Sequence, residues 1–291
     1  MAKLQTTGLG VALVTPFNED LSIDFDGLDR MINHVIKGGC DYIVALGTTA
    51  ETPTLSSAEK IKLTSFISQC AGGRLPLVIG IGGNNTFEVV NMIKEHDLTG
   101  YSAVLSVTPY YNKPTQKGLI KHYNMIADAS PLPVILYNVP GRTGVNLTAK
   151  STLELAKHPN IGGIKEASGD LRQIEEIINN KPEDFSVISG DDGCICPIMK
   201  MGGEGVISVL ANAFPKQISE MVKRCVSKEF EPAELIQEEL KELTKHVFSE
   251  GNPAGIKFAL SELGLINNIL RLPLVEISEE TEKKIKMTMP R

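Results

Sequence analysis

Eight short apolar runs recur along the chain, and they limit the possible folds more than any other feature of the sequence. Each run contains several β-branched residues and few or no charged ones. Runs of this kind are typical of strands that are buried on both faces of a parallel sheet. The runs lie at residues 11–15, 42–46, 76–80, 103–107, 133–137, 161–165, 186–190 and 205–209.

Segments with helical periodicity separate these runs. From Phe25 to Ile36 the apolar residues follow a 3.6-residue spacing, and the pattern stops at the pair Gly38-Gly39. The same spacing recurs after Ser57, around 119–126 and around 171–178. Strands that alternate with helices over about 220 residues predict an α/β protein of the (β/α)₈ TIM-barrel class.

An open, doubly wound sheet is the alternative fold, and it usually has a glycine-rich first turn. Here the first turn reads T-P-F-N-E-D and has no glycine, and G-I-G-G-N-N at 80–85 ends in Asn85, where a dinucleotide-binding fingerprint needs glycine. After residue 214 the pattern is helical to the end. We therefore expect a barrel at 1–230 that carries the active site, and a C-terminal helical extension at 231–291 packed on it.

Charge and cysteine content exclude several classes of protein. With 29 basic and 35 acidic residues, the chain lacks the basic balance of a nucleic-acid binder. No segment approaches the roughly 20 apolar residues that cross a membrane. The odd, scattered set of five cysteines and a start without an apolar signal segment indicate a cytoplasmic protein with reduced thiols. Cys194 and Cys196 lack a second ligand pair for zinc, so we expect no metal.

Polar residues gather at the predicted carboxyl ends of the strands, where barrel enzymes carry their chemistry. The segments concerned are G-T-T-A-E (47–51), T-P-Y-Y-N-K-P (108–114), Y-N-V-P-G-R-T-G (137–144), Lys165-Glu166 and S-G-D-D (189–192). The five histidines lie instead on predicted helices or helix ends, where we expect solvated surface: His34, His96, His122, His158 and His246.

Lys165 ends one of the apolar runs. Strand alternation puts Ile161, Gly163 and Lys165 on one face, with Gly163 leaving room for the lysine stem, and Glu166 on the other face. If Lys165 points into the barrel, desolvation disfavours its ammonium form, and a neutral amine can attack a carbonyl. A lysine at a strand end can equally form a structural ion pair or extend to solvent. A close Lys165–Glu166 pair is not expected.

Three other strand ends offer matching chemistry. Thr48 and Thr49 suit a carboxylate, although they also suit an ordinary turn. Tyr137 can act as a general acid and base, although a buried tyrosine often only finds a hydrogen-bond partner. Arg142 can hold a second carboxylate or simply face solvent. Together with Lys165 these residues indicate a Schiff-base aldolase that acts on a 2-keto acid.

The motifs G-T-T-A-E, T-P-Y-Y-N-K-P, L-Y-N-V-P-G-R-T-G, G-I-K-E-A-S and G-V-I-S-V, in this order, closely resemble the dihydrodipicolinate synthase family. The resemblance covers essentially the whole chain. This family belongs to the pyruvate-dependent class I aldolases, which also include N-acetylneuraminate lyase. The resemblance implies condensation of pyruvate with L-aspartate 4-semialdehyde, in lysine and diaminopimelate biosynthesis, without a cofactor.

The resemblance also implies roles for individual residues. Lys165 would form the Schiff base with pyruvate, and Thr48 and Thr49 would bind its carboxylate. Tyr137 would relay protons through Thr48 and Tyr111. Tyr111 would reach into the active site of a neighbouring subunit, which requires at least a dimer; a tetramer, a dimer of dimers, is usual. Arg142 would bind the carboxylate of aspartate semialdehyde, and Gly190 and the backbone at Ile207 would line the pyruvate pocket.

Two positions depart from the family pattern. Ala50 stands where glycine is usual, and it would strain the loop by roughly 1 kcal/mol if the position needs a positive φ. Lys60 stands where strongly lysine-inhibited members have histidine. The other residues of their inhibitory lysine site, Asn84, Glu88 and Tyr110, are present. A cation at Lys60 would repel the ammonium groups of lysine, so we expect weak or absent inhibition.

The alternatives are another aldolase of the superfamily, either N-acetylneuraminate lyase or a 2-keto-3-deoxy sugar acid aldolase, and a non-catalytic barrel that binds a keto acid. Tyr111 and the P-G-R-T-G motif argue against the lyase. A non-catalytic barrel would tolerate loss of the lysine or the tyrosines, and all of them are present.

Overall fold

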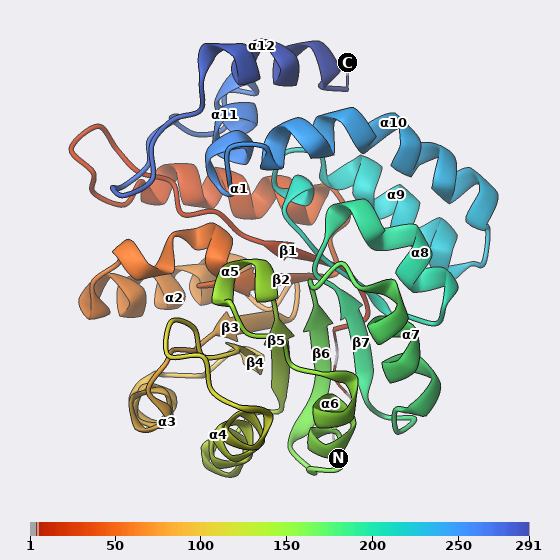
Figure 1. Cartoon of the computed structure of the whole chain (residues 1–291). Coiled ribbons are helices and arrows are strands. Elements are labelled where there is room, and N and C mark those ends of the chain that lie inside the picture. Colours follow the sequence, from red (N-terminus) through yellow and green to blue (C-terminus); the bar gives the residue numbers. More distant parts are fainter. Residues whose placement is uncertain (1–3, 5, 291) are drawn as a thin grey trace.

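A computed structural model describes residues 4 and 6–290, and its centre is a closed barrel of parallel strands (Figure 1). Each strand pairs with the next, and β8 closes the barrel by pairing with β1. The strands are β1 (Gly8–Ala12), β2 (Tyr42–Ala45), β3 (Leu77–Gly80), β4 (Tyr101–Val107), β5 (Val134–Asn138), β6 (Ile161–Glu166), β7 (Ser186–Ser189) and β8 (Gly205–Ser208).

Helices surround the barrel and follow the strands in alternation (Figure 1). They are α1 (Phe25–Lys37), α2 (Ser57–Ala71), α3 (Thr86–Glu95), α4 (Gln116–Ala129), α5 (Pro140–Thr143), α6 (Ala149–Leu155), α7 (Leu171–Asn180), α8 (Ile195–Lys200), α9 (Pro215–Val226), α10 (Phe230–Phe248), α11 (Ala254–Glu262) and α12 (Glu279–Thr288). The predicted TIM barrel is thus confirmed.

The first strand lies closer to the N-terminus than predicted. We expected it at 11–15, but β1 runs from Gly8 to Ala12. The backbone N–H of Val14 donates to the Asn212 side chain, 3.1 Å away, and has left the sheet. Gly10 is needed in the strand because a β-carbon there would lie 2.2 Å from the Tyr42 ring. Glycines weaken a strand signal, so the prediction favoured the more apolar run that follows.

Local signals set the helix boundaries. Asp24 caps α1 by accepting from the Gly27 N–H, and Gly38 follows its last turn. Ser56 and Glu59 form a capping box at the start of α2, and Gly72, with a φ of 55°, ends that helix. The stop predicted at Gly38-Gly39 is confirmed, and Gly72 likewise ends the next helix, because a left-handed or tight helix end is cheapest for glycine.

Two apolar layers make up the core. The larger layer fills the space between the sheet and the outer helices. The smaller one fills the barrel interior. Most of its members are inward-facing strand residues, and Leu4 and Val139 lie just outside the strands: Leu4, Ala12, Tyr42, Val44, Val78, Ala103, Leu105, Ile135, Tyr137, Val139, Ile188 and Ile207. The interior is therefore packed with side chains below the mouth of the barrel, which leaves the strand ends as the place for a site.

The chain continues after α9 into the three C-terminal helices drawn in blue in Figure 1. Helix α10 packs on α8 and α9, and α11 and α12 pack on α10 and on each other. The prediction of C-terminal helices on the barrel is confirmed; the boundary after residue 230 stays a prediction.

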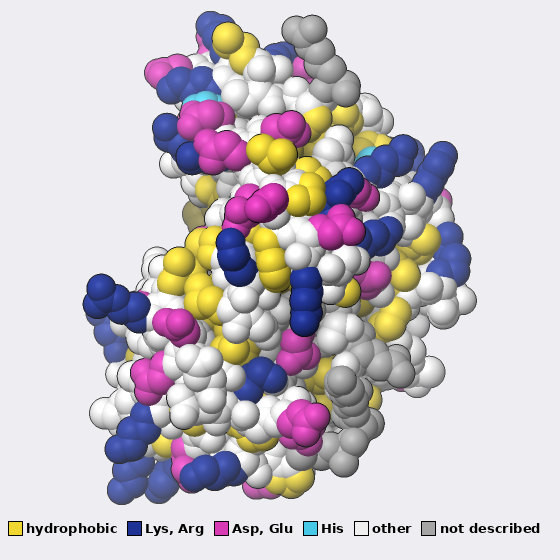
Figure 2. Space-filling view, turned by 90° about the vertical axis from the view of Figure 1, so that its right-hand side faces the viewer, with side chains coloured by type: hydrophobic (Ala, Val, Ile, Leu, Met, Phe, Trp, Pro, Cys, Tyr) yellow, Lys and Arg dark blue, Asp and Glu magenta, His cyan; other side chains and the backbone are white. Residues whose placement is uncertain are grey.

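Charges of both signs are interspersed on the face shown in Figure 2, with hydrophobic side chains between them. A nucleic-acid interface would instead gather lysine and arginine into one patch. Among the described helices, none combines the length and apolarity needed to cross a bilayer.

Candidate active site

Lys165 lies in the barrel interior at the carboxyl end of β6. In the sheet it is level with Tyr137 of β5 and Ile188 of β7, both of which belong to the interior layer. Lys165 is only 5% exposed, and its Nζ atom is 4.4 Å from the centre of the Tyr137 ring. An amine and a phenol are thus adjacent in a largely dehydrated place, which is the arrangement that imine chemistry with proton transfer needs.

The space for the Lys165 stem comes from Gly190 rather than from Gly163 as we predicted. A β-carbon at Gly190 would lie 3.0 Å from Lys165 Cε and 2.7 Å from Ala167 Cβ. Next to Gly163, the space is taken by the carbonyl oxygen of Ser186, which would be 2.6 Å from an added β-carbon. Gly190 follows β7 directly, so the glycine that matters belongs to the neighbouring strand.

Ile161 does not share the face of Lys165, contrary to the simple alternation we assumed. The pairing of β5 with β6 shifts by one residue, so that Val134 pairs with Ile161 but Ile135 pairs with Gly163. Ile161 consequently packs in the outer layer, with the helices. A single irregularity in a strand reverses the face of every residue before it, and the sequence gives no sign of it here.

Glu166 points away from Lys165, as expected. Its carboxylate is fully buried and accepts hydrogen bonds from Asn138 Nδ2 at 2.6 Å, Gln173 Nε2 at 2.8 Å and the Ser168 N–H at 2.9 Å. These bonds join the ends of β5 and β6 to α7. They satisfy the carboxylate without the lysine, so Glu166 fixes the strand end that carries Lys165.

A second buried lysine, Lys257 of α11, is the obvious rival for the reactive amine. Burial lowers the pKa of Lys257 to about 8, with the neighbouring Glu51 opposing the shift. However, Lys257 Nζ is 2.5 Å from Glu51 Oε1 and donates to the Ile269 carbonyl at 2.8 Å. Its side chain is completely enclosed. An amine held by two oxygens and closed to substrate cannot serve as the nucleophile, so geometry favours Lys165.

Thr48 and Thr49 lie in a 3₁₀ turn, Thr48–Ala50, that directly follows β2. The turn exposes Thr48 partly, whereas Thr49 is only 2% exposed. The left-handed residue of this loop is Glu51, with a φ of 54°, and Ala50 belongs to the helical turn before it. Position 50 therefore does not need a positive φ, and alanine causes no strain there although the family usually has glycine.

From this conformation we predict that Ala50→Gly lowers stability rather than relieving strain. Glycine in a helical conformation costs about 0.5–1 kcal/mol relative to alanine, because the unfolded chain gains conformational freedom. Urea denaturation should show this loss, while the rate of turnover stays within about twofold. A more stable and more active glycine variant would contradict the prediction.

A cavity of about 340 Å³ opens at the mouth of the barrel. Five of the residues singled out from the sequence line it: Thr48, Lys60, Tyr110, Tyr137 and Arg142. Arg142 is exposed and lies on the short helix α5, which begins with Pro140. The cavity is therefore lined by a buried phenol, an exposed guanidinium group and the hydroxyl groups of Thr48 and Tyr110.

Tyr111 lies outside this arrangement. It has a φ of 67° and is 88% exposed, although it is large and aromatic. Asn84 and Glu88 are also exposed, just before α3 and in its first turn, and the Asn84 carbonyl accepts from Asn112 Nδ2 at 3.0 Å. Large aromatic side chains that are exposed in this way often mark protein–protein contacts.

Asp192 shapes the loop that follows β8, a role we did not foresee in S-G-D-D. Its buried carboxylate accepts from the Ser208 hydroxyl and from the backbone N–H groups of Val209 and Leu210, at 2.9 Å and 3.3 Å for the last two. Burial raises the pKa of Asp192 to about 6, against the effect of these hydrogen bonds. The turn just beyond Ile207 is thus fixed by the loop after β7.

His122 is buried, so the expectation that all five histidines face solvent is wrong for this residue. It is 5% exposed on α4, and its Nδ1 atom is 2.8 Å from the Thr86 hydroxyl. Burial lowers the pKa of His122 to about 4. A histidine on the inner face of an amphipathic helix has no sequence signature that separates it from a solvated one.

The buried His122 predicts a pH dependence of stability. Because its folded pKa of about 4 lies below the ordinary value near 6.5, the unfolded chain binds the extra proton between these limits. The free energy of unfolding should therefore fall as the pH drops through this window, by about 2 kcal/mol between pH 7 and 5. The variant His122→Gln should lose this component in urea denaturation at the two pH values. Equal losses in both proteins would contradict the prediction.

The cysteines show no arrangement for a metal. Cys196 is buried with its Sγ 3.7 Å from that of Cys225, while Cys194 lies near Asp191. Within residues 4 and 6–290, no group of three or more His, Cys, Asp or Glu side chains is placed to hold an ion.

Comparison with known proteins gives one consistent result. The sequence profile of the Dihydrodipicolinate synthetase family matches residues 5–290. The 4-hydroxy-tetrahydrodipicolinate synthase of Parabacteroides distasonis is 48% identical over 287 residues, which cover 98% of this chain and 97% of that protein.

Two solved structures extend the comparison to three dimensions. A chloride-inhibited dihydrodipicolinate synthase from Acinetobacter baumannii, complexed with pyruvate, is 40% identical, with a TM-score of 0.94 over 97% of both chains. The enzyme from Cyanidioschyzon merolae with lysine bound is 36% identical, with a TM-score of 0.93 over 97% of both chains. With a family match over nearly its whole length and a relative close to half identical, this chain belongs to the dihydrodipicolinate synthetase family.

Proposed function

We propose that this protein condenses pyruvate with L-aspartate 4-semialdehyde through a Schiff base on Lys165. The product cyclises as in the 4-hydroxy-tetrahydrodipicolinate synthases, and the reaction serves lysine and diaminopimelate biosynthesis in the cytoplasm. The observation that carries the proposal is the buried Lys165 amine 4.4 Å from the ring of Tyr137, a residue that lines a cavity together with Thr48 and Arg142. The similarity to a pyruvate-bound relative supports the choice of keto acid.

The first half of the mechanism forms a nucleophile from pyruvate. The neutral amine of Lys165 attacks the carbonyl carbon, and loss of water leaves a protonated imine. Thr48 and Thr49 hold the carboxylate, and Gly190 and the backbone at Ile207 line the pocket. The imine withdraws electrons, so the methyl group can lose a proton and become an enamine. Tyr137 carries protons in these steps, relaying them through Thr48 and Tyr111.

The second half joins the two substrates. The enamine carbon attacks the aldehyde of aspartate semialdehyde, whose carboxylate Arg142 binds in a bidentate manner. The aldehyde oxygen takes a proton and becomes a hydroxyl group. The amine of the second substrate then attacks the imine carbon, which breaks the bond to Lys165 and returns the lysine as a free amine. No cofactor takes part in this sequence.

Substrate choice tests the proposal against the related aldolases. Purified protein should consume aspartate semialdehyde when pyruvate is present, and it should not cleave N-acetylneuraminate or a 2-keto-3-deoxy sugar acid. The variant Arg142→Lys keeps the charge but not the bidentate geometry, so KM for aspartate semialdehyde should rise more than KM for pyruvate. Cleavage of sialic acid by the unaltered protein would overturn the assignment.

The proposal includes a homo-oligomer, a dimer at least and a tetramer built as a dimer of dimers. The exposed Tyr111, with its left-handed backbone, supports this because its phenol completes a proton relay only in a partner's site. Sedimentation of the purified protein would test it, and full activity of a monomer would contradict it.

We predict that lysine inhibits this enzyme weakly or not at all. Lys60 lines the cavity together with Tyr110, and its cation would repel the ammonium groups of a bound lysine. Replacing it, Lys60→His, should lower the half-inhibitory lysine concentration by roughly tenfold, since about 1.4 kcal/mol of repulsion is relieved. The variant Lys60→Gln separates loss of charge from gain of the imidazole. Micromolar inhibition of the unaltered enzyme in a rate assay would contradict the prediction.

A further inference from the structure

A polar contact joins the C-terminal helices to the turn that carries the two threonines. Asn252 lies between α10 and α11, and its Nδ2 atom donates a hydrogen bond to Thr49 Oγ1 over 2.9 Å. The two residues are 203 positions apart in the sequence, and they are 7% and 2% exposed. Thr49 is one of the residues proposed to bind pyruvate, so a buried hydrogen bond to its hydroxyl suggests a role for Asn252 beyond packing.

The direction of this bond limits what the Thr49 hydroxyl can do. An amide nitrogen carries donors only, whereas a hydroxyl group has one proton and two lone pairs. Thr49 Oγ1 therefore accepts from Asn252 and keeps its own proton for another acceptor. The adjacent group proposed to need a donor is the carboxylate of pyruvate.

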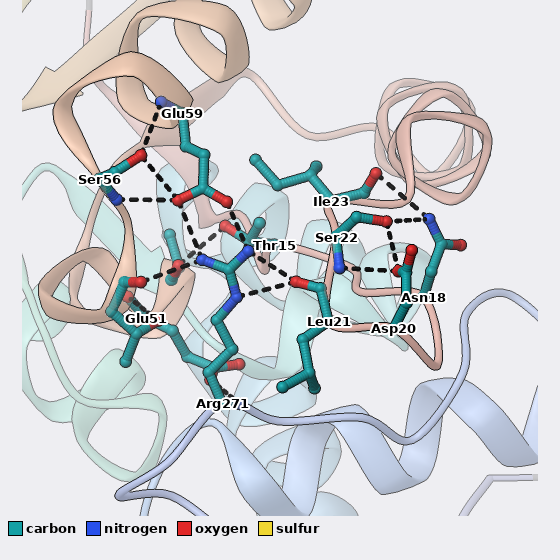
Figure 3. A network of polar contacts seen from close by, with 12 residues as sticks. Thr15, Asn18, Asp20, Leu21, Ser22, Ile23, Glu51, Ser56, Glu59 and Arg271 are labelled. Carbon is teal, nitrogen blue, oxygen red and sulfur yellow. Dashed lines mark hydrogen bonds and ion pairs between the residues drawn. The ribbon is translucent and has the colours of Figure 1, made fainter.

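Further contacts hold the same turn. The buried Glu51 carboxylate accepts from the Arg271 backbone N–H at 3.0 Å and pairs with Lys257. The Arg271 guanidinium donates to the Thr54 carbonyl at 3.0 Å, and Figure 3 shows it pairing with Glu59 at the start of α2. The Thr15 hydroxyl donates to the Ala50 carbonyl at 2.8 Å. These contacts hold the backbone of the turn without Asn252. Within residues 4 and 6–290, the Asn252 amide is the hydrogen-bond partner of the Thr49 hydroxyl.

We infer that Asn252 is a positioning residue, whose amide orients the Thr49 hydroxyl proton toward the carboxylate of pyruvate. This inference rests on the proposed function and adds to it a part for the C-terminal helices. Loss of the amide donor lets the hydroxyl rotate away from the substrate. It should weaken the binding of pyruvate and leave aspartate semialdehyde unaffected, because Arg142 holds the second substrate.

The test compares Asn252→Asp with Asn252→Leu. Aspartate keeps the shape of asparagine, but its ionised carboxylate only accepts hydrogen bonds. The Thr49 hydroxyl would then donate to the aspartate and not to pyruvate. The pyruvate concentration for half-maximal borohydride trapping at Lys165 should rise about 10- to 100-fold in Asn252→Asp, the usual effect of losing a hydrogen bond to a charged group. In Asn252→Leu it should rise less. KM for aspartate semialdehyde should stay within about twofold in both.

A double-mutant cycle with Thr49→Val separates positioning from a structural role. Valine has the shape of threonine without the hydroxyl, so in this background Asn252→Leu should change pyruvate binding little further. Additive effects, or pyruvate binding unchanged in Asn252→Asp, would overturn the inference. If only one of the Asn252 variants folds, as judged by its melting temperature, that variant decides the outcome. Unaltered protein without a trapped adduct would instead refute the proposed function itself.

Discussion

Replacing Lys165 by methionine should abolish synthesis and remove the adduct that borohydride traps with pyruvate. Turnover should fall by on the order of 10⁴-fold or more, because the covalent route is lost entirely when its nucleophile is removed. Methionine fills nearly the same volume beside Gly190, so the barrel should remain folded. Mass spectrometry of the digested, reduced protein should find the adduct only on the peptide that carries Lys165.

Two other lysines provide controls for this result. Lys200 is exposed on α8 and pairs with Glu234, so Lys200→Met should keep full activity and trapping. Lys257 is the other buried lysine of the described chain, and an adduct on its peptide would contradict the role of Lys165 as the nucleophile. Retention of the adduct in Lys165→Met would have the same meaning.

Removing the phenol of Tyr137 should have the second largest effect. In Tyr137→Phe the ring that faces Lys165 is kept but its proton is lost, so kcat should fall by about 10²- to 10⁴-fold, the range usual for a general acid and base. Binding should change little, so KM for pyruvate should stay within a few fold. The imine should still be trapped, only more slowly.

Tyr101 is the matched control for this variant. It is also a buried tyrosine on a strand, and its hydroxyl donates to the Thr64 carbonyl at 3.0 Å, away from the cavity. Tyr101→Phe should cost about 1 kcal/mol of stability and leave kcat unchanged. An equal loss of kcat in both variants would show that Tyr137 acts by stabilising the fold and not by transferring protons.

The sequence revealed the parts of this protein that depend on local pattern. Strand runs and helix stops define the barrel, and the ends of the strands carry Lys165, Tyr137 and Arg142, because a parallel barrel brings those ends together. Two predictions were wrong because they depended on more than local pattern. The irregular pairing of β6, which reverses the face of Ile161, and the inward position of His122 both depend on contacts with other strands and helices.

Contacts between residues far apart in the sequence could not be predicted from the motifs. Asn252 has no neighbour in the sequence that suggests a link to Thr49, and Gly190 shows its use only once β6 and β7 are side by side. Such contacts are set by tertiary packing, which overrides local preference and leaves no periodic trace. The resemblance to a known family suggested which residues contact the substrate, but it gave no indication of the residues that hold those side chains in place.

The distance along the chain between Thr49 and Asn252 has a consequence for synthesis on the ribosome. At about 5–20 residues per second, the 203 positions between them take roughly 10–40 s to translate. During that time the turn that follows β2 lacks its C-terminal partners, since Lys257 and Arg271 emerge later than Asn252. A nascent or prematurely terminated chain could therefore build much of the barrel while remaining unable to bind a keto acid. Catalytic competence should appear only with the last helices.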